Sequence, residues 1–206
     1  GYAIGAYSLA LKTVDGGANW LPLVVSAPQE AAPAAALTAD DSGTFDESML
    51  EMGADSDPHL NAITRTESGK LLIMGERGAG FLSADEGATW RKVQLEYKGS
   101  MFGVISLCGE RVVSFGLRGN VYESNDAGAT WTKQDSGTQA SLLGGVMNDK
   151  GDVAIVGGNG TLLLRKADET GFTAKHLLLS AGQTPSFTSV TPASDGFLMA
   201  SDMGYV

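Results

Sequence analysis

Three aspartates with closely similar surroundings are the residues that could do chemistry in this chain. Asp15, Asp85 and Asp126 each stand in the pattern [ST]-x-D-x-G-x-[TN]-W. A carboxylate can act as a general acid, a general base or a nucleophile, and glycoside hydrolysis uses a close pair of them. Spacing along the chain does not establish such closeness. The alternative is that each aspartate accepts hydrogen bonds within a tight turn.

The shared pattern favours the structural role. Each copy also holds a glycine, which tolerates a positive φ, and a tryptophan that would open the next strand and pack between neighbouring sheets. The positions are Asp15, Gly17 and Trp20, then Asp85, Gly87 and Trp90, then Asp126, Gly128 and Trp131. We therefore expect these residues to shape the fold rather than to catalyse.

The pattern belongs to a repeat of 41 residues, the distance from Trp90 to Trp131. A second pattern, G-x-x-G, begins at Gly75, Gly116 and Gly157 with the same spacing. Two independent markers that share one period indicate a repeat architecture.

Each repeat is expected to hold four short strands. In the second repeat these lie at about 60–65, 70–74, 80–83 and 90–95, separated by turn residues. The first repeat lacks its opening strand, the fourth has lost the aspartate pattern at 166–171, and a fifth begins at Phe187. Four strands per repeat is typical of a propeller blade. The sequence predicts an all-β, partial β-propeller of about four to five blades, forming one domain over 1–206.

An acidic insertion interrupts the repeat between the first and second blades. Trp90 follows Trp20 by 70 positions, which is 29 more than the period, and the excess falls at about 27–57. The segment begins rich in Ala and Pro and then carries eight carboxylates with no Lys or Arg. It is either a solvated loop or a docking loop, with a short helical turn at 46–52. Asp46, Glu47 and Glu51 are its candidate binding residues.

Two arginines are the second candidate group. In a four-stranded blade, the connection to the next blade leaves on the same face as the turn between the second and third strands. That face would therefore carry the insertion together with Arg77 and Arg118, which occupy equivalent positions in adjacent repeats. They are either solvated turn residues or part of a site for an anion or a protein partner, which suits guanidinium geometry.

Composition excludes several classes of function. The net charge of −10 argues against a nucleic-acid partner. Cys108 is the only cysteine, so no internal disulfide can form, and His59 and His176 lack the spacing of a zinc site. No phosphate or dinucleotide motif is found, and no apolar run is long enough to span a membrane. We expect no metal and no cofactor.

The aspartate pattern together with G-x-x-G resembles the Asp-box, or bacterial neuraminidase repeat, propellers. Among these the chain is similar to the photosystem II stability/assembly factor-like family, in its non-photosynthetic bacterial branch. The segments that carry this likeness are 58–63 (PHLNAI), 116–119 (GLRG) and 141–145 (SLLGG). The resemblance implies a seven-bladed, periplasmic or otherwise exported assembly factor. It also suggests association with membrane transporters of the resistance-nodulation-division type.

The chain is shorter than that resemblance implies. A ring would need further blades, either N-terminal ones or those of another copy, and the start at Gly1 fits a processed or truncated product. Two functions stay open. The favoured one is a non-catalytic scaffold that binds a protein of a membrane complex. The alternative is a sialidase-like glycoside hydrolase or a carbohydrate-binding propeller, although none of the arginines stands in a recognisable sialidase motif.

Overall fold

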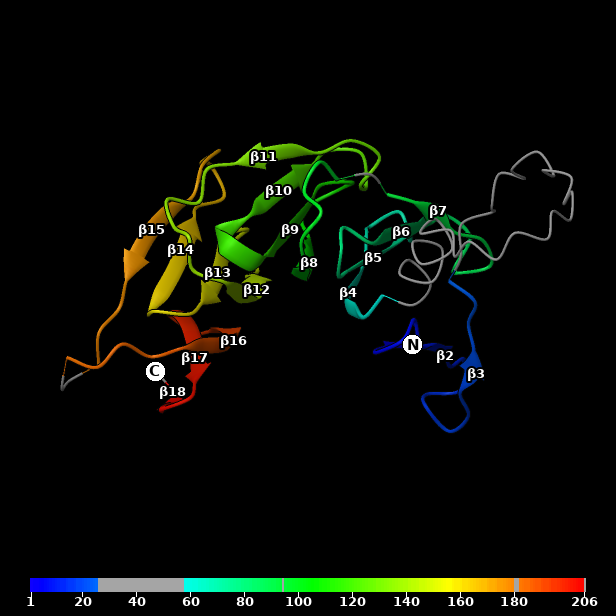
Figure 1. Cartoon of the computed structure of the whole chain (residues 1–206), viewed down its shortest axis with the longest axis horizontal. Coiled ribbons are helices and arrows are strands. Elements are labelled where there is room, and N and C mark those ends of the chain that lie inside the picture. Colours follow the sequence, from blue (N-terminus) through cyan, green and yellow to red (C-terminus); the bar gives the residue numbers. More distant parts are fainter. Residues whose placement is uncertain (26–57, 94, 180–181, 206) are drawn as a thin grey trace, which may run out of the picture.

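The computed structural model describes residues 1–25, 58–93, 95–179 and 182–205, and these residues form five antiparallel sheets (Figure 1). The strands of the first two sheets are β1 (Tyr2–Ile4), β2 (Ala10–Lys12) and β3 (Leu21–Pro22), then β4 (Leu60–Arg65), β5 (Leu71–Gly75), β6 (Gly80–Ser83) and β7 (Arg91–Lys92). The third sheet holds β8 (Met101–Ser106), β9 (Val112–Gly116), β10 (Val121–Ser124) and β11 (Thr132–Gln134), with a short 3-10 turn, η1 (Leu117–Gly119). The last two hold β12 (Leu142–Met147), β13 (Val153–Gly157), β14 (Thr161–Arg165) and β15 (Thr173–His176), then β16 (Phe187–Ala193), β17 (Gly196–Ser201) and β18 (Gly204–Tyr205).

The sheets follow one another around an arc in sequence order (Figure 1). The strands β4, β8, β12 and β16 are neighbours along the inside of this arc. The three central sheets have four strands each, and the described parts of the first and last sheets have three. The predicted all-β partial propeller of four-stranded blades is therefore confirmed. The insertion at 27–57, with Asp46, Glu47 and Glu51, lies outside the described residues.

Strand positions agree closely with the expected ones. In the second blade, β4 and β6 have the predicted bounds, and β5 begins one residue later than predicted. The outer strand is the exception, because β7 spans only Arg91–Lys92. A strand at the outer edge of a blade has a neighbour on one side only, so little pairing holds it beyond the first residues.

The second strand of each central blade is apolar on both faces. On β5, Leu71 and Ile73 lie in the core shared with the first sheet, and Leu72 and Met74 lie in the core shared with the third. On β13, Val153 and Ile155 lie in the core shared with the third sheet, and Ala154 and Val156 lie in the core shared with the fifth. Because successive side chains of a strand point to opposite faces, the continuous apolar runs serve two junctions at once.

Two of the three motif tryptophans fill these junctions. Trp90 is 3% exposed and lies in the core between the first and second sheets. Trp131 packs in the core between the second and third sheets. Trp20, in the first sheet, is 41% exposed.

The ring of Phe115 packs where two glycines leave room for it. Phe115, which is 1% exposed, packs over Gly103 of β8 and Gly145 of β12. A Cβ atom on Gly145 would approach the Phe115 ring to 2.6 Å, and one on Gly103 would overlap the same ring. The absence of two side chains thus allows the inner strands of adjacent blades to close around Phe115.

We expect Gly145→Ala to lower the free energy of unfolding by about 1–3 kcal/mol, because the added methyl group overpacks the core. Denaturant unfolding measures the change. Gly158→Ala is the matched control, because a Cβ atom there meets nothing within 4 Å. Equal stability of both variants would contradict this account of the junction.

Candidate functional site

The aspartate turns, at 13–20, 83–90 and 124–131, share one hydrogen-bond arrangement. In the second blade, the Ser83 hydroxyl donates to Asp85 Oδ1 at 2.7 Å and accepts from the Gly87 amide at 2.8 Å. The Thr89 amide also donates to Asp85 Oδ1, at 2.8 Å. The same bonds recur around Asp15 and Asp126. Each carboxylate therefore replaces the ladder partners that a tight turn lacks.

These bonds also fix the charge of the aspartates. Hydrogen bonds from Asn19 and Thr13 lower the pKa of Asp15 to about 2, and those from Thr89 and Ser83 lower the pKa of Asp85 to about 2. Burial raises the pKa of Asp126, but its hydrogen bonds outweigh burial and the pKa is lowered. A general acid needs a pKa raised toward the working pH. The three aspartates stand in three different blades and are held ionised.

The inside of the arc carries little acid–base chemistry. The strands β4, β8, β12 and β16 contain no Asp or Glu. Within the described residues, no group of three or more His, Cys, Asp and Glu could hold a metal ion. The described part of the chain also contains no helix long and apolar enough to cross a membrane.

Arg77 and Arg118 lie in equivalent turns between second and third strands, and both are exposed. Each has a positive φ, 52° and 57°, and each precedes a glycine that also has a positive φ. These turns contact the connections between blades: the Gly78 amide donates to the Gly99 carbonyl and the Leu117 amide to the Ser100 carbonyl, both at 3.0 Å. The arginines and the inter-blade connections therefore share one rim of the propeller, here called the arginine rim.

The surroundings of Arg118 are polar. Arg118 lines a cavity of about 560 Å³ together with Lys133, Asn120 and Gln139, and Asp135 is the carboxylate among its lining residues. This cavity lies beside η1 and has more positive than negative side chains.

An aromatic group stands at the neighbouring position of the arginine rim. Tyr7 is 76% exposed, and its ring packs edge-on against the ring of His59, with the two ring centroids 5.1 Å apart. His59 Nδ1 lies 3.6 Å from Glu76 Oε1, and Glu76 directly precedes Arg77. His59 is thus tied into the junction of the first two blades, and the described residues place no metal ligand set around it.

The fourth blade replaces the aspartate turn with a different structure on the opposite rim. Arg165 stands where Ser83 and Ser124 stand in the earlier blades. Its Nη1 atom donates to Glu123 Oε2 at 2.7 Å, and Arg111 donates to the other oxygen at the same distance. The side chains of Glu123 and Arg165 are only 9% and 3% exposed. A buried ion pair therefore joins the third and fourth blades.

The rebuilt turn, 165–172, has its own supports. Asp152 accepts from Lys166 Nζ at 2.8 Å and from the Ala167 amide at 3.2 Å. The hydrogen bond from Lys166 lowers the pKa of Asp152, and the same bond raises the pKa of Lys166. The Arg165 guanidinium lies 4.7 Å from the centre of the Phe172 ring. The repeat spacing was the one sequence signal for this site, because it aligns Arg165 with two serines.

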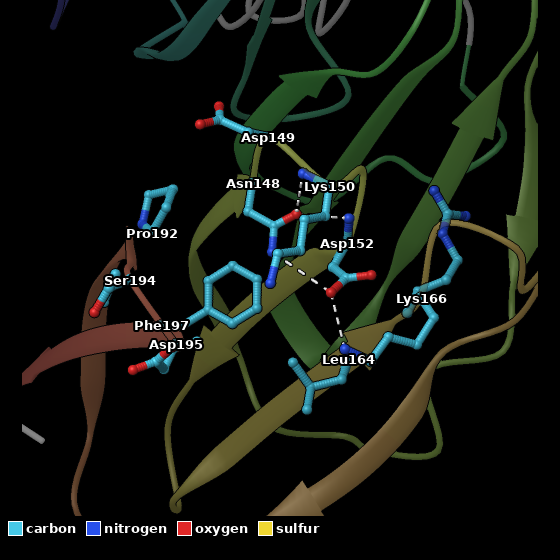
Figure 2. Close-up of a pocket in the computed structure, with 13 residues that line it drawn as sticks. Asn148, Asp149, Lys150, Asp152, Leu164, Lys166, Pro192, Ser194, Asp195 and Phe197 are labelled. Carbon is cyan, nitrogen blue, oxygen red and sulfur yellow. Dashed lines mark hydrogen bonds and ion pairs between the residues drawn. The ribbon is translucent and has the colours of Figure 1, made fainter.

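Two grooves flank the rebuilt turn. One, of about 730 Å³, lies between the third and fourth blades and is lined by Arg111, Glu123, Asp168 and Phe172, among others. The other, of about 560 Å³, lies between the fourth and fifth blades (Figure 2). Sequence reasoning did not predict either groove.

Solved structures of low sequence identity share this fold. YCF48 bound to D1 peptide matches with a TM-score of 0.65 and 17% identity, over 98% of this chain and 56% of that one. YCF48 from Cyanidioschyzon merolae matches with 0.64 and 16%, over 98% and 60%. The Cps50 (Swd1) β-propeller domain of Myceliophteria thermophila matches with 0.61 and 12%, over 96% and 62%. The chain thus spans less than two thirds of the length of each of these structures.

No protein-family model matches the chain, and no curated protein matches it. At the identities of the structural matches, the likeness establishes the β-propeller fold.

The low pKa values of Asp15 and Asp85 predict acid sensitivity. Because their pKa values are depressed from 3.8 to about 2, their contribution to stability is complete above about pH 4 and is lost as the pH falls toward 2. Urea unfolding across this window should show a shallower pH dependence for Asp85→Asn than for the natural chain. An unchanged slope in Asp85→Asn would refute the assignment.

The buried ion pair predicts strong non-additivity. Glu123→Leu should lower the free energy of unfolding by about 3–5 kcal/mol, because it leaves Arg165 buried without its partner. Glu123→Leu combined with Arg165→Leu should recover most of this loss, because the double variant removes both buried charges. The positions equivalent to Glu123 in the blades on either side are already apolar, Leu82 and Leu164. A denaturant-based double-mutant cycle measures the coupling. Simple addition of the two single effects would argue against the pair.

Proposed function

We propose that this chain is a non-catalytic propeller scaffold that binds a protein partner through the arginine rim. The observation that carries the proposal is the repetition of an exposed arginine at one turn position in adjacent blades, Arg77 and Arg118. Guanidinium groups bind carboxylates with paired hydrogen bonds, so an acidic segment of the partner is the expected ligand.

The backbone makes this repetition informative. A positive φ disfavours most residues other than glycine, and asparagine tolerates it better than others. The fourth blade has Asn159 at the equivalent position, with φ 54°. Arginine at positions 77 and 118 is therefore not what the turn itself would favour, which supports a role for the side chain.

The structural comparisons support a binding role. A propeller of this fold, YCF48, has been solved with a D1 peptide bound. We extend the same kind of role to this chain, as an Asp-box assembly or accessory factor for a bacterial membrane protein complex. A transporter of the resistance-nodulation-division type is the specific partner we propose, with the propeller on the periplasmic side.

A hydrolase is the less favoured function. The motif aspartates are held ionised by hydrogen bonds, which suits turns and not proton donation. Turnover of a fluorogenic sialoside, or of another glycoside in a panel, would overturn the scaffold proposal directly.

We expect the double variant Arg77→Ala, Arg118→Ala to lose partner binding by about tenfold or more, because two charge-assisted contacts are removed. The measurement is affinity capture from detergent-solubilised membranes of the native source, followed by quantitative mass spectrometry. Arg91→Ala combined with Lys92→Ala removes two exposed cationic side chains from the outer strand β7 and serves as the charge-matched control. Full retention of the captured protein by the double variant would refute the role of the arginine rim.

A further inference from the structure

The larger cavities of the propeller differ in charge and in aromatic content. The cavity beside Arg118 contains no aromatic residue and has an excess of positive groups. The groove between the third and fourth blades has four carboxylates against one arginine, and its aromatic residue, Phe172, is engaged by Arg165. The groove between the fourth and fifth blades combines an aromatic ring with nearly balanced charge.

The lining of this third groove combines apolar and polar side chains. Phe197 and Leu164 form the apolar part, and Figure 2 shows the Phe197 ring lying among the polar side chains. Both residues also pack against the core between these blades, which fixes their position. With a volume of about 560 Å³, the groove falls within the range typical of small-molecule sites.

The charges around the groove nearly balance. Its lining contains three carboxylates and three cationic side chains: Asp149, Asp152, Asp195, Lys150, Arg165 and Lys166. Because Arg165 is already paired with Glu123 of the third blade, three carboxylates and two lysines remain, so the net field of the site favours a charged ligand only weakly. A neutral ligand that offers both donors and acceptors would find an acceptor or a donor on every side.

Part of the polar lining of the groove is held in place by hydrogen bonds within the protein. Asn148 Oδ1 accepts from the Lys150 amide at 3.0 Å and from the Asp152 amide at 2.9 Å, which closes the turn between β12 and β13. Asp152 is held in turn by Lys166. A wall ordered before the ligand arrives lowers the entropy cost of binding.

We propose that this groove binds a neutral sugar. One face of a pyranose ring is made of C–H groups and would pack on Phe197, since apolar surface gains from burial against an aromatic ring. Its hydroxyls both donate and accept, so they match the carboxylates and lysines of the lining, among which Asp149, Asp195 and Lys150 are exposed. The site lies on the rim opposite Arg77 and Arg118 and does not depend on the protein-binding proposal.

The proposal is tested by saturation-transfer NMR with the methyl glycosides of glucose, galactose, mannose and N-acetylglucosamine, followed by titration of whichever binds. At least one should bind saturably. Asp195→Ala and Phe197→Leu should each weaken it by about tenfold or more, a loss of about 1.4 kcal/mol. Phe197→Leu keeps an apolar side chain in the core, so thermal unfolding of this variant distinguishes lost binding from lost folding.

Arg118→Ala, on the opposite rim, is the control and should bind the glycoside as the natural chain does. Failure of every glycoside to bind saturably would overturn the proposal. So would a glycoside that binds with unchanged affinity to folded Asp195→Ala and Phe197→Leu, or one that loses affinity in Arg118→Ala. None of these results bears on partner capture through the arginine rim.

Discussion

The second strand of each central blade buries both of its faces, and the rest of the structure depends on this. Leu71 and Ile73 belong to one junction while Leu72 and Met74 belong to the next, so the second blade cannot complete its core without both neighbours. The faces of the central sheets are consequently buried against their neighbours. The two rims, where the turns and connections lie, remain accessible, and binding residues of proteins concentrate on such loops.

The aspartate turns show how one set of hydrogen bonds decides between structure and chemistry. The amide and hydroxyl groups that Asp85 accepts from are the same groups that lower its pKa, so closing the turn leaves a carboxylate unsuited to donate a proton. The fourth blade reaches a stable turn differently. It buries Glu123 and Arg165, which costs desolvation, and the two guanidinium contacts to Glu123 together with Phe172 offset that cost.

The periodic features of the fold could be predicted from the sequence. The 41-residue spacing was enough to predict the blades, their strands and the equivalence of Arg77 with Arg118, because a repeat converts position in sequence into position in space. The Glu123–Arg165 pair and the groove at Phe197 were not predicted from the sequence. Both depend on which side chains of different blades meet across a junction, and the period alone does not contain that information. The outer strand β7 was overestimated because edge pairing, rather than residue type, limits its length.

The side chains on the two rims are constrained in different ways, which is consistent with the different ligands proposed for them. On the arginine rim, the backbone requires a positive φ at one turn position, but the side chain there points to solvent and can change from Asn159 to Arg118 without disturbing a core. Single substitutions at this position can therefore change the charge of the rim without changing the turn. On the opposite rim, side chains such as Asp85 and Ser83 hold the turn itself, so they are not available for recognition. A site can form there only where the turn is supported in another way, and the fourth blade, with its buried ion pair, meets that condition.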